Sequence, residues 1–398
     1  MINVKTPADQ PEPRDTYKIA YIIHFLLGAG NLLPWNAFIT GVDYFGFLYP
    51  NRHVEKVFSV AYMSCSILVL VLMLIWGSCY GKLSSRLTLN LGFSMFVLSL
   101  MVAPLIDWVW CTESSEKTYG VTVASVAICG IADGLVGGSL MGSAGRLPKQ
   151  YMQAVFAGTA SSVFAAGVIV SFLRISTKAL LPQNSKGLRT SAHLYFLFST
   201  MILLCCIICC NLLYKLPVMQ KHSKIEQTAD PFCLKPQIFA VAQKVRWPAF
   251  GIFIIYIVTL SIFPGFIAEN LESKILQDWY PILLITVYNI ADLVGKSLTA
   301  IYILQSINKA TWASIARLLF YPLFTAFLHG PTWLKTEVPM VVLTFMLGLT
   351  NGYLTSVMMI LVPKSVPVTD AELSAIVMVV FLGLGLVGGS VLGWFWII

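Results

Sequence analysis

Eleven long apolar stretches, separated by polar loops, dominate this sequence. A membrane-spanning helix needs about 20 apolar residues, because 20 residues at about 1.5 Å rise cross a hydrocarbon core of about 30 Å. Each stretch is continuous and about twice as long as a strand of a transmembrane barrel, which predicts helices. We therefore expect an all-α membrane protein with eleven transmembrane helices. They lie at approximately 19–39, 57–80, 87–106, 119–145, 152–173, 191–214, 247–266, 280–304, 310–328, 338–361 and 375–397.

The composition supports a membrane protein and excludes most other classes. Hydrophobic residues make up 57% of the chain and charged residues only 11%, against about 25% charged in soluble domains. Disordered chains, coiled coils, disulfide-rich secreted scaffolds and soluble enzymes do not have this balance. The net charge of +8 comes from basic residues in loops. Because these form no continuous basic face, we expect no nucleic-acid partner.

The distribution of Lys and Arg predicts the orientation. Residues 1–17 form a polar tail without the pattern of a cleaved signal peptide, so the first span is expected to anchor the chain. Loops on the side of the N-terminus hold 15 Lys and Arg residues, and the opposite loops hold 9. The positive-inside rule then places the N-terminus in the cytoplasm and the C-terminus on the extracytoplasmic side.

One long polar break, residues 215–246, divides the apolar stretches into six and five. This predicts a six-helix bundle at 18–214, a cytoplasmic linker at 215–246 and a five-helix bundle at 247–398. Two bundles with a binding site between them at mid-membrane are typical of secondary transporters.

Four ionisable side chains fall inside predicted spans: Asp133, Asp292, Lys296 and Arg317. A charge at the bilayer centre costs about 3 kcal/mol on insertion scales, so such residues usually face a polar cavity or a partner. Asn289, Asp292 and Lys296 share one helix face. An internal ion pair is one interpretation. The additional amide of Asn289, which an ion pair does not require, favours a binding site.

Asp133 has no basic neighbour in its own helix, so its partner must come from another helix. Glycines recur every four residues around it, at Gly130, Gly134, Gly138 and Gly142. Such a stripe is typical of close helix packing. Arg317 has two interpretations: it extends to the membrane interface, or it pairs with Asp292 across the bundle.

Prolines inside predicted spans, among them Pro34, Pro264 and Pro322, predict bends in these helices. Beside Pro34 stand Trp35 and Asn36, an aromatic ring and an amide suited to a planar heterocycle. The alternative for Trp35 is a residue of the interfacial aromatic belt.

Catalytic and metal-binding patterns are absent from the spans. No span carries a nucleophile with a base, paired catalytic carboxylates or clustered histidines, so we do not expect an enzyme. The cysteine cluster at 205–210 has no second group of ligands at zinc spacing, and its thiols are read as small apolar side chains. We predict no metal site and no cofactor. A receptor or scaffold is not excluded by composition.

The segment GAGNLLPWNAFITGVDYF at 28–45 resembles the opening signature of the equilibrative nucleoside transporter family (solute carrier 29 type). Further segments resemble the same family in order along the chain: RLPKQYMQAVFAGTASS at 146–162, which is closest to plant members, TLSIFPGFIAE at 259–269, YNIADLVGKSLTA at 288–300, ARLLFYPL at 316–323 and LTNGYLTSVMMILVPKSV at 349–366. The resemblance covers nearly all of residues 17–398.

This resemblance implies eleven helices in a fold similar to the major facilitator type, moving nucleosides by alternating access. It also implies that Asp292 and Lys296 hold the ribose hydroxyls while aromatic and amide groups hold the base. Buried pairings of this kind weaken the binding of ligands without the ribose diol. The substrate-binding residues implied by the resemblance are Leu32, Trp35, Asn36, Ile39, Phe263, Asn289, Asp292 and Lys296.

Three positions depart from other members. Many carry arginine where this chain has Lys296, which replaces a planar bidentate group with a point charge. Many have a base-contacting glutamine where this chain has Gly137, which predicts a wider pocket that tolerates purines. Asp133 stands where several animal relatives have glycine. We hypothesise that it couples transport to protons, because burial among apolar helices favours the protonated carboxyl group.

The sequence therefore predicts a nucleoside transporter that is proton-coupled if Asp133 has this role. The alternative is a nucleobase or organic-cation carrier of the same fold. Expected partners are purine and pyrimidine nucleosides, protons and the lipid bilayer, with no obligate protein partner. The plasma membrane is the default location, and a vacuolar or other internal membrane is the alternative.

Overall fold

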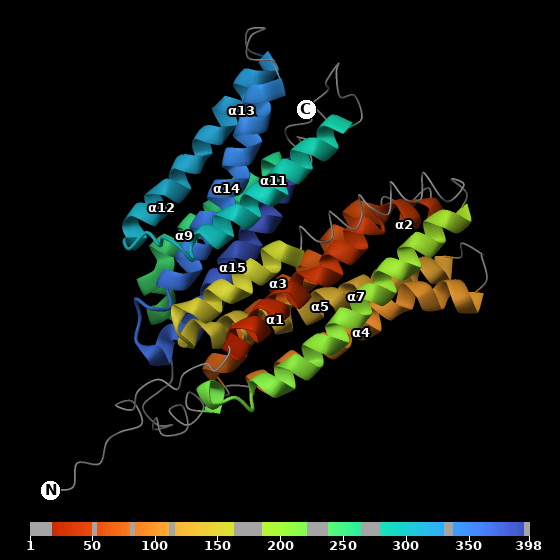
Figure 1. Cartoon of the computed structure of the whole chain (residues 1–398), viewed down its shortest axis with the longest axis horizontal. Coiled ribbons are helices and arrows are strands. Elements are labelled where there is room, and N and C mark those ends of the chain that lie inside the picture. The colour runs from red at the N-terminus through yellow and green to blue at the C-terminus, as the bar shows by residue number, and fades with distance from the viewer. Residues whose placement is uncertain are drawn as a thin grey trace, which may run out of the picture.

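In the computed structural model of this protein, the described residues are 18–49, 54–79, 84–110, 116–162, 185–220, 238–263, 279–329 and 337–393. Every regular element in these ranges is helical (Figure 1). Residues 149–162 are also helical. The other elements are α1 (Ile19–Thr40), α2 (Val42–Leu48), α3 (Val54–Cys79), α4 (Ser85–Trp110), α5 (Glu116–Arg146), α7 (Ser185–Leu213), α9 (Ile238–Ile262), α11 (Trp279–Leu298), α12 (Ile307–Ala316), η3 (Arg317–Leu319), α13 (Phe320–His329), α14 (Glu337–Leu361) and α15 (Val368–Gly393).

Seven helices within the described ranges are long and apolar enough to cross a membrane: α3, α4, α5, α7, α9, α14 and α15. The four remaining predicted spans, the first, fifth, eighth and ninth, are not among these seven helices. The ninth is divided into α12 and α13 by a 3₁₀ turn, η3, which ends three residues before Pro322. Of the fifth, predicted at 152–173, only residues 152–162 are described. An all-α, multi-span membrane protein is thus confirmed.

Two helix boundaries differ from the sequence prediction. α9 begins at Ile238, inside the range predicted for the linker, because a helix continues past the apolar residues that hydropathy detects. α11 ends at Leu298, short of the predicted residue 304. There the Thr299 hydroxyl donates to the backbone carbonyl of Lys296 at 2.7 Å, which satisfies one carbonyl of the last turn. Pro264 lies outside the described residues.

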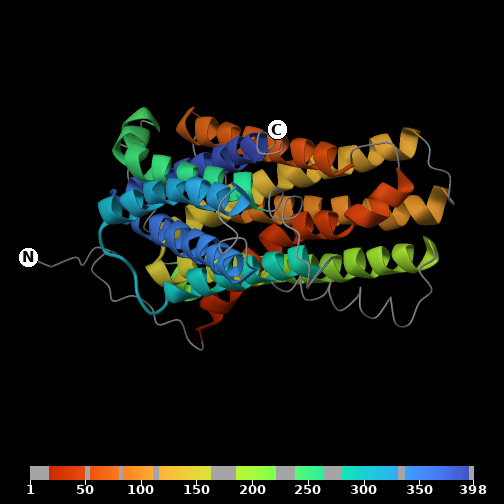
Figure 2. The same cartoon turned by 90° about the horizontal axis from the view of Figure 1, so that it is seen from above.

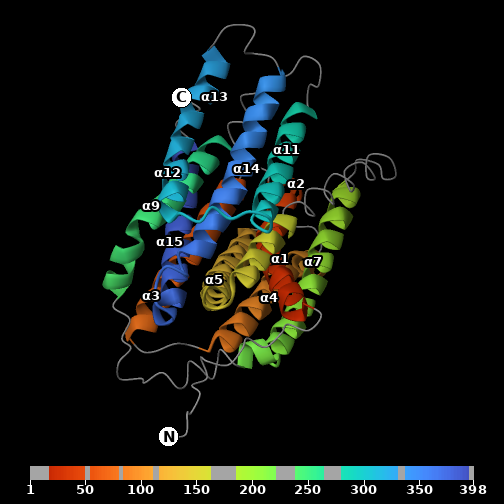
Figure 3. The same ribbon diagram turned by 60° about the vertical axis from the view of Figure 1, so that its left-hand side comes forward.

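The helices pack in two sets, and α15 lies between them. α1, α3, α4, α5 and α7 pack against one another, while α9, α11, α12 and α14 form the second set. α15 packs along α9 and also against α3 and α5. Figure 2 shows the long helices running in roughly one direction, and in Figure 1 the two sets diverge toward the ends that carry α2 and α13. Figure 3 shows α12, α13 and α14 on the side of the molecule away from α4 and α7. The domain limits at 18–214, 215–246 and 247–398 stay a prediction.

The glycine stripe of α5 is a packing surface, as predicted. A Cβ added to Gly130 would lie 2.3 Å from the carbonyl oxygen of Tyr62, and one added to Gly134 would lie 2.7 Å from that of Ser66. Both carbonyls belong to α3. The absence of side chains on this face therefore lets the two backbones approach closely, which positions Ser66 opposite Asp133.

α11 and α14 approach through glycines in the same way. A Cβ on Gly352 would lie 2.2 Å from the carbonyl oxygen of Asp292, and a Cβ on Gly295 would lie 2.3 Å from that of Leu349. Real side chains do not tolerate such distances from backbone atoms. These glycines bring the polar residues of the two helices within hydrogen-bonding distance.

The end of α5 is held against the start of α15. Arg146 and Glu372 form an ion pair there, and the Lys364 ammonium donates to the backbone carbonyl of Leu147. Gly142 faces the Glu372 side chain, and Gly145 faces Ala375. Both sets of helices are therefore joined at the end of the molecule where α1 begins.

We predict that Gly352→Ala destabilises the protein by about 1–3 kcal/mol, because the added methyl group must push α11 away from α14. The measurement is the thermal unfolding midpoint of the detergent-solubilised protein. Gly120→Ala in α5 is the matched control, since a Cβ at Gly120 meets no atom within 4 Å. Equal midpoints for the two variants would contradict the close approach.

Candidate functional site

The centre of the candidate site is an ion pair on α11. The Lys296 Nζ lies 2.8 Å from Asp292 Oδ2, one helical turn away. Both residues are buried, with 7% and 6% of their surfaces exposed. The predicted shared helix face thus brings the acid and the base into direct contact, while Asn289 on the preceding turn is half-buried.

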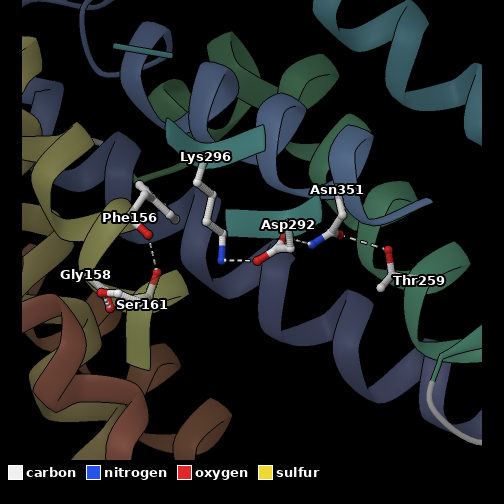
Figure 4. Close-up of polar contacts among 8 residues, drawn as sticks. Phe156, Gly158, Ser161, Thr259, Asp292, Lys296 and Asn351 are labelled. Atoms are coloured by element: carbon white, nitrogen blue, oxygen red, sulfur yellow. Dashed lines mark hydrogen bonds and ion pairs between the residues drawn. The ribbon is translucent and has the colours of Figure 1, made fainter. Parts of the chain in front are cut away.

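The second oxygen of Asp292 is held by α14. Asn351 Nδ2 donates to Asp292 Oδ1 at 2.8 Å, and Asn351 Oδ1 accepts from the Thr259 hydroxyl of α9 at 2.9 Å. Figure 4 shows this series of polar contacts from Lys296 to Thr259. Neither Asn351 nor Thr259 was predicted from the sequence. The available signal was an amide in the interior of the apolar α14, whose one charged residue is Glu337 at its start.

Arg317 has neither of the two roles considered from the sequence. It is 3% exposed, so it does not extend to the membrane interface, and its guanidinium does not contact Asp292 directly. Nη2 donates to the Thr259 hydroxyl at 2.7 Å, and Nη1 donates to Thr350 Oγ1 at 2.6 Å and to the Leu347 carbonyl at 3.2 Å. Hydrogen bonds through Thr259 and Asn351 therefore connect Arg317 to Asp292.

An aromatic pair adjoins α11. The ring of Phe263, directly after α9, stacks on that of Tyr288 with 3.9 Å between centroids and 17° between planes. Tyr288 is buried and directly precedes Asn289, while Phe263 is half-buried. The predicted residues Phe263 and Asn289 thus lie on the same side of the molecule as the ion pair.

The predicted α1 residues make their contacts within the set of helices that contains α1 and α3. The ring of Trp35 lies 4.6 Å from that of Tyr62 in α3, and the Asn36 amide donates to Ser162 at 3.5 Å. Trp35, Asn36 and Leu32 are all half-buried. The Trp35 ring therefore packs within the protein, which argues against a role in an interfacial belt. The side chain of Ile39 lies outside what the structure describes.

Asp133 receives its partner from α3, as expected for a carboxylate without a neighbour in its own helix. The Ser66 hydroxyl donates to Asp133 Oδ2 at 2.7 Å. The Tyr62 hydroxyl lies close enough to interact electrostatically with the same carboxylate. Because Tyr62 also packs on Trp35, one tyrosine contacts both a predicted pocket residue and the predicted proton-coupling residue.

Gly137, one turn from Asp133, faces α1. The nearest atoms to a Cβ at this position belong to the amide of Asn31, at 3.8 and 3.9 Å. These are ordinary contact distances. The position where many family members are expected to carry glutamine therefore has space beside it, bordered by an amide from α1.

The structure groups the predicted residues in two places. Asp292, Lys296, Asn289 and Phe263 lie in the set that contains α9 and α11, and Trp35, Asn36 and Asp133 lie in the set that contains α1 and α5. In Figure 4, Gly158 and Ser161 of the helical residues 149–162 lie on the side of Lys296 opposite Asp292. The arrangement can offer hydrogen-bond donors and acceptors from one set of helices and aromatic surface from the other.

Comparison with known proteins decides the family. The sequence profile of a family described as "Nucleoside transporter" matches residues 123–234 and 225–398. The chain belongs to the nucleoside transporter family.

Two relatives from Arabidopsis thaliana illustrate the similarity. Equilibrative nucleotide transporter 8 is 65% identical over 399 residues, which covers all of both chains. Equilibrative nucleotide transporter 1 is 47% identical over 412 residues, which covers 100% of this chain and 90% of the relative. The resemblance to the plant members of this family is thereby confirmed. Relatives of this identity are named transporters, in agreement with the prediction that the chain is not an enzyme.

The fold resembles that of major facilitator superfamily transporters. A proton:xylose symporter of that superfamily superimposes with a TM-score of 0.63 at 13% identity, covering 96% of this chain and 89% of the symporter. The transporter FucP in the outward conformation gives a TM-score of 0.62 at 14% identity, covering 95% of this chain and 90% of FucP. At these identities the likeness concerns the fold alone.

We predict that Asp292→Ala and Lys296→Met each destabilise this transporter by about 3–5 kcal/mol, because each leaves a buried charge without its partner. The double variant should lose less than the sum of the two single losses. Thermal midpoints in detergent measure this. If the loss of stability in the double variant equals the sum of the two single losses, a direct interaction between Asp292 and Lys296 is contradicted.

Proposed function

We propose that this member of the family carries nucleosides across the membrane by alternating access. The observation that carries the proposal is the buried Asp292–Lys296 pair at 2.8 Å, on the helix that also presents Asn289. A ribose diol offers hydroxyl protons to Asp292 and lone pairs to Lys296. The pair can therefore exchange its internal contact for contacts with the sugar, and an ion pair of this kind is costly to bury without such a use.

The charges within the spans favour a neutral solute. Among the described helices, Asp133 and Asp292 oppose Lys296 and Arg317, so the four formal charges sum to zero. A nucleotide carries phosphate charges that need further cations in a membrane interior. Although the relatives above are named nucleotide transporters, this balance supports an uncharged nucleoside as the substrate of this chain.

The base would lie toward α1. Trp35 offers an aromatic face beside Tyr62, and the Asn36 amide shares only a long 3.5 Å contact with Ser162. Because Gly137 carries no side chain, we expect a purine to be accepted as well as a pyrimidine. Leu32, Ile39 and Phe263 complete the proposed binding set.

The topology belongs to the proposal as well. Eleven spans would form a six-helix bundle and a five-helix bundle, with the N-terminus in the cytoplasm and the C-terminus outside. The contacts of Arg146 with Glu372 and of Lys364 with Leu147 then close the cytoplasmic end, which corresponds to a state open to the outside. Reopening requires α5 and α15 to separate. The plasma membrane is the proposed location.

Uptake of radiolabelled adenosine and uridine into a nucleoside-transport-deficient host tests the proposed substrate. We expect both nucleosides to be taken up and to compete with each other, while free adenine and adenosine monophosphate do not compete. Competition by adenine would indicate a nucleobase carrier instead. Competition by the monophosphate would contradict the argument from charge.

Proton coupling through Asp133 is the second part of the proposal. Its support is a carboxylate within an apolar helix, held by Ser66 and close to Tyr62, which packs on Trp35. Proton binding at Asp133 would change how Ser66 and Tyr62 are held, and Tyr62 transmits this change to the ring of Trp35. The carrier would then be a symporter.

We expect acidic external medium to raise nucleoside uptake, because protonation neutralises Asp133, and a protonophore to remove this increase. In Asp133→Asn, which carries no titratable group, uptake should no longer depend on the pH gradient. Asp370→Asn, at the start of α15, is the control for loss of a carboxylate elsewhere. If Asp133→Asn keeps the wild-type rate and pH dependence, Asp133 is not the coupling residue.

A further inference from the structure

Asp292 is connected to a second buried cation through two neutral side chains. Lys296 contacts one carboxylate oxygen at 2.8 Å and Asn351 contacts the other at 2.8 Å. The Thr259 hydroxyl lies 2.9 Å from Asn351 Oδ1, and Arg317 Nη2 lies 2.7 Å from the Thr259 hydroxyl. We call Arg317, Thr259, Asn351 and Asp292 the relay (Figure 4 shows all but Arg317).

The direction of each hydrogen bond in the relay is fixed by chemistry. An ionised carboxylate only accepts, so Asn351 must present its NH₂ group to Asp292. The amide oxygen of Asn351 then faces Thr259 and also only accepts, so the Thr259 hydroxyl donates to it, sharing its single proton with the Ile255 backbone carbonyl at 2.8 Å. Arg317 only donates, which suits the remaining lone pair of the Thr259 oxygen. The positive end of the relay is therefore Arg317 and the negative end is Asp292.

Arg317 is held away from the sugar site. Its guanidinium is anchored by the Leu347 carbonyl and Thr350 on α14 and by Thr259 on α9, and it lies 5.7 Å from the ring of Phe320. Three hydrogen bonds to two helices leave it little freedom. Lys296, in contrast, holds Asp292 through the end of a flexible four-carbon chain.

We infer that Arg317, acting through Thr259 and Asn351, is the standing counter-ion of Asp292, so that Lys296 can leave Asp292 and bind the sugar. The inference rests on the proposed function. When Lys296 turns to the ribose, Asp292 keeps the Asn351 donor and the polarisation that Arg317 imposes on the relay. Thr259, Asn351 and Arg317 are thus positioning residues, which set the carboxylate for the ribose diol without contacting it.

The test separates recognition of the diol from general stability. The Michaelis constant and maximal rate for uptake are measured for adenosine and for 2′,3′-dideoxyadenosine, with uridine and 2′,3′-dideoxyuridine as a second pair. In the wild type, the relay predicts a lower Michaelis constant for each ribonucleoside than for its dideoxy analogue. Failure of the wild type to transport nucleosides would overturn the proposed function and the inference together, whereas transport without this discrimination would overturn the inference alone.

Thr259→Val removes the relay hydroxyl at nearly constant volume. We expect the Michaelis constant for the ribonucleosides to rise about tenfold, the effect of one lost hydrogen bond to a charged network. The constants for the dideoxy analogues should stay close to wild type. Thr259→Ser, which keeps the hydroxyl, should restore the discrimination. If Thr259→Val does not reach the membrane, Thr259→Cys, with its weak donor, gives the same readout.

Thr350→Val is the matched control. It removes the hydrogen bond from Arg317 Nη1 to Thr350 Oγ1 at 2.6 Å, which is not part of the relay to Asp292. The ratio of the two Michaelis constants should therefore remain that of the wild type. A wild-type transporter that discriminates, combined with a Thr259→Val variant that keeps the ratio or weakens both substrates equally, would overturn the inference and leave the proposed function intact.

Discussion

The cost of placing charge in a lipid interior governs this structure. Asp292, Lys296 and Arg317 lie on or directly beside apolar transmembrane helices, and each is at least nine-tenths buried. Each of them has a hydrogen-bond or ion-pair partner on a neighbouring helix or the preceding turn. These interactions determine which faces of α9, α11 and α14 meet, and they concentrate polarity at one level of the second set of helices.

Backbone proximity makes this polarity possible. Asn351 is a short side chain, and it reaches Asp292 only because Gly352 and Gly295 allow α14 and α11 to touch through their backbones. The same principle applies on the other side of the molecule, where the glycines of α5 bring Ser66 to Asp133. In both places glycines allow two helix backbones to approach closely, and polar side chains then form hydrogen bonds between the two helices.

Much of the arrangement follows from local sequence, and the remainder depends on contacts between distant segments. The spacing of Asn289, Asp292 and Lys296 predicts one helix face, since three- and four-residue separations are fixed by helix geometry. The regular glycines of α5 likewise predict a packing face. The partners of these faces cannot be read locally, because the separations from Asp292 to Asn351 and from Asn351 to Thr259 span whole helices. For the same reason the sequence left two interpretations of Arg317 open, and the structure supports a third. The start of α9 was misplaced because hydropathy detects the apolar part of a helix and not its polar extension.

α5 is a continuous helix of 31 residues with no proline in it. It carries Asp133 in its middle and Arg146 at its last position, about 20 Å further along at 1.5 Å per residue. A stiff rod of this kind cannot tilt at one end alone. If α5 moves as one rigid body, a movement that separates Arg146 from Glu372 would also displace Asp133 relative to Ser66 and Tyr62, and would so couple the contact between α5 and α15 to the position of a buried carboxyl group.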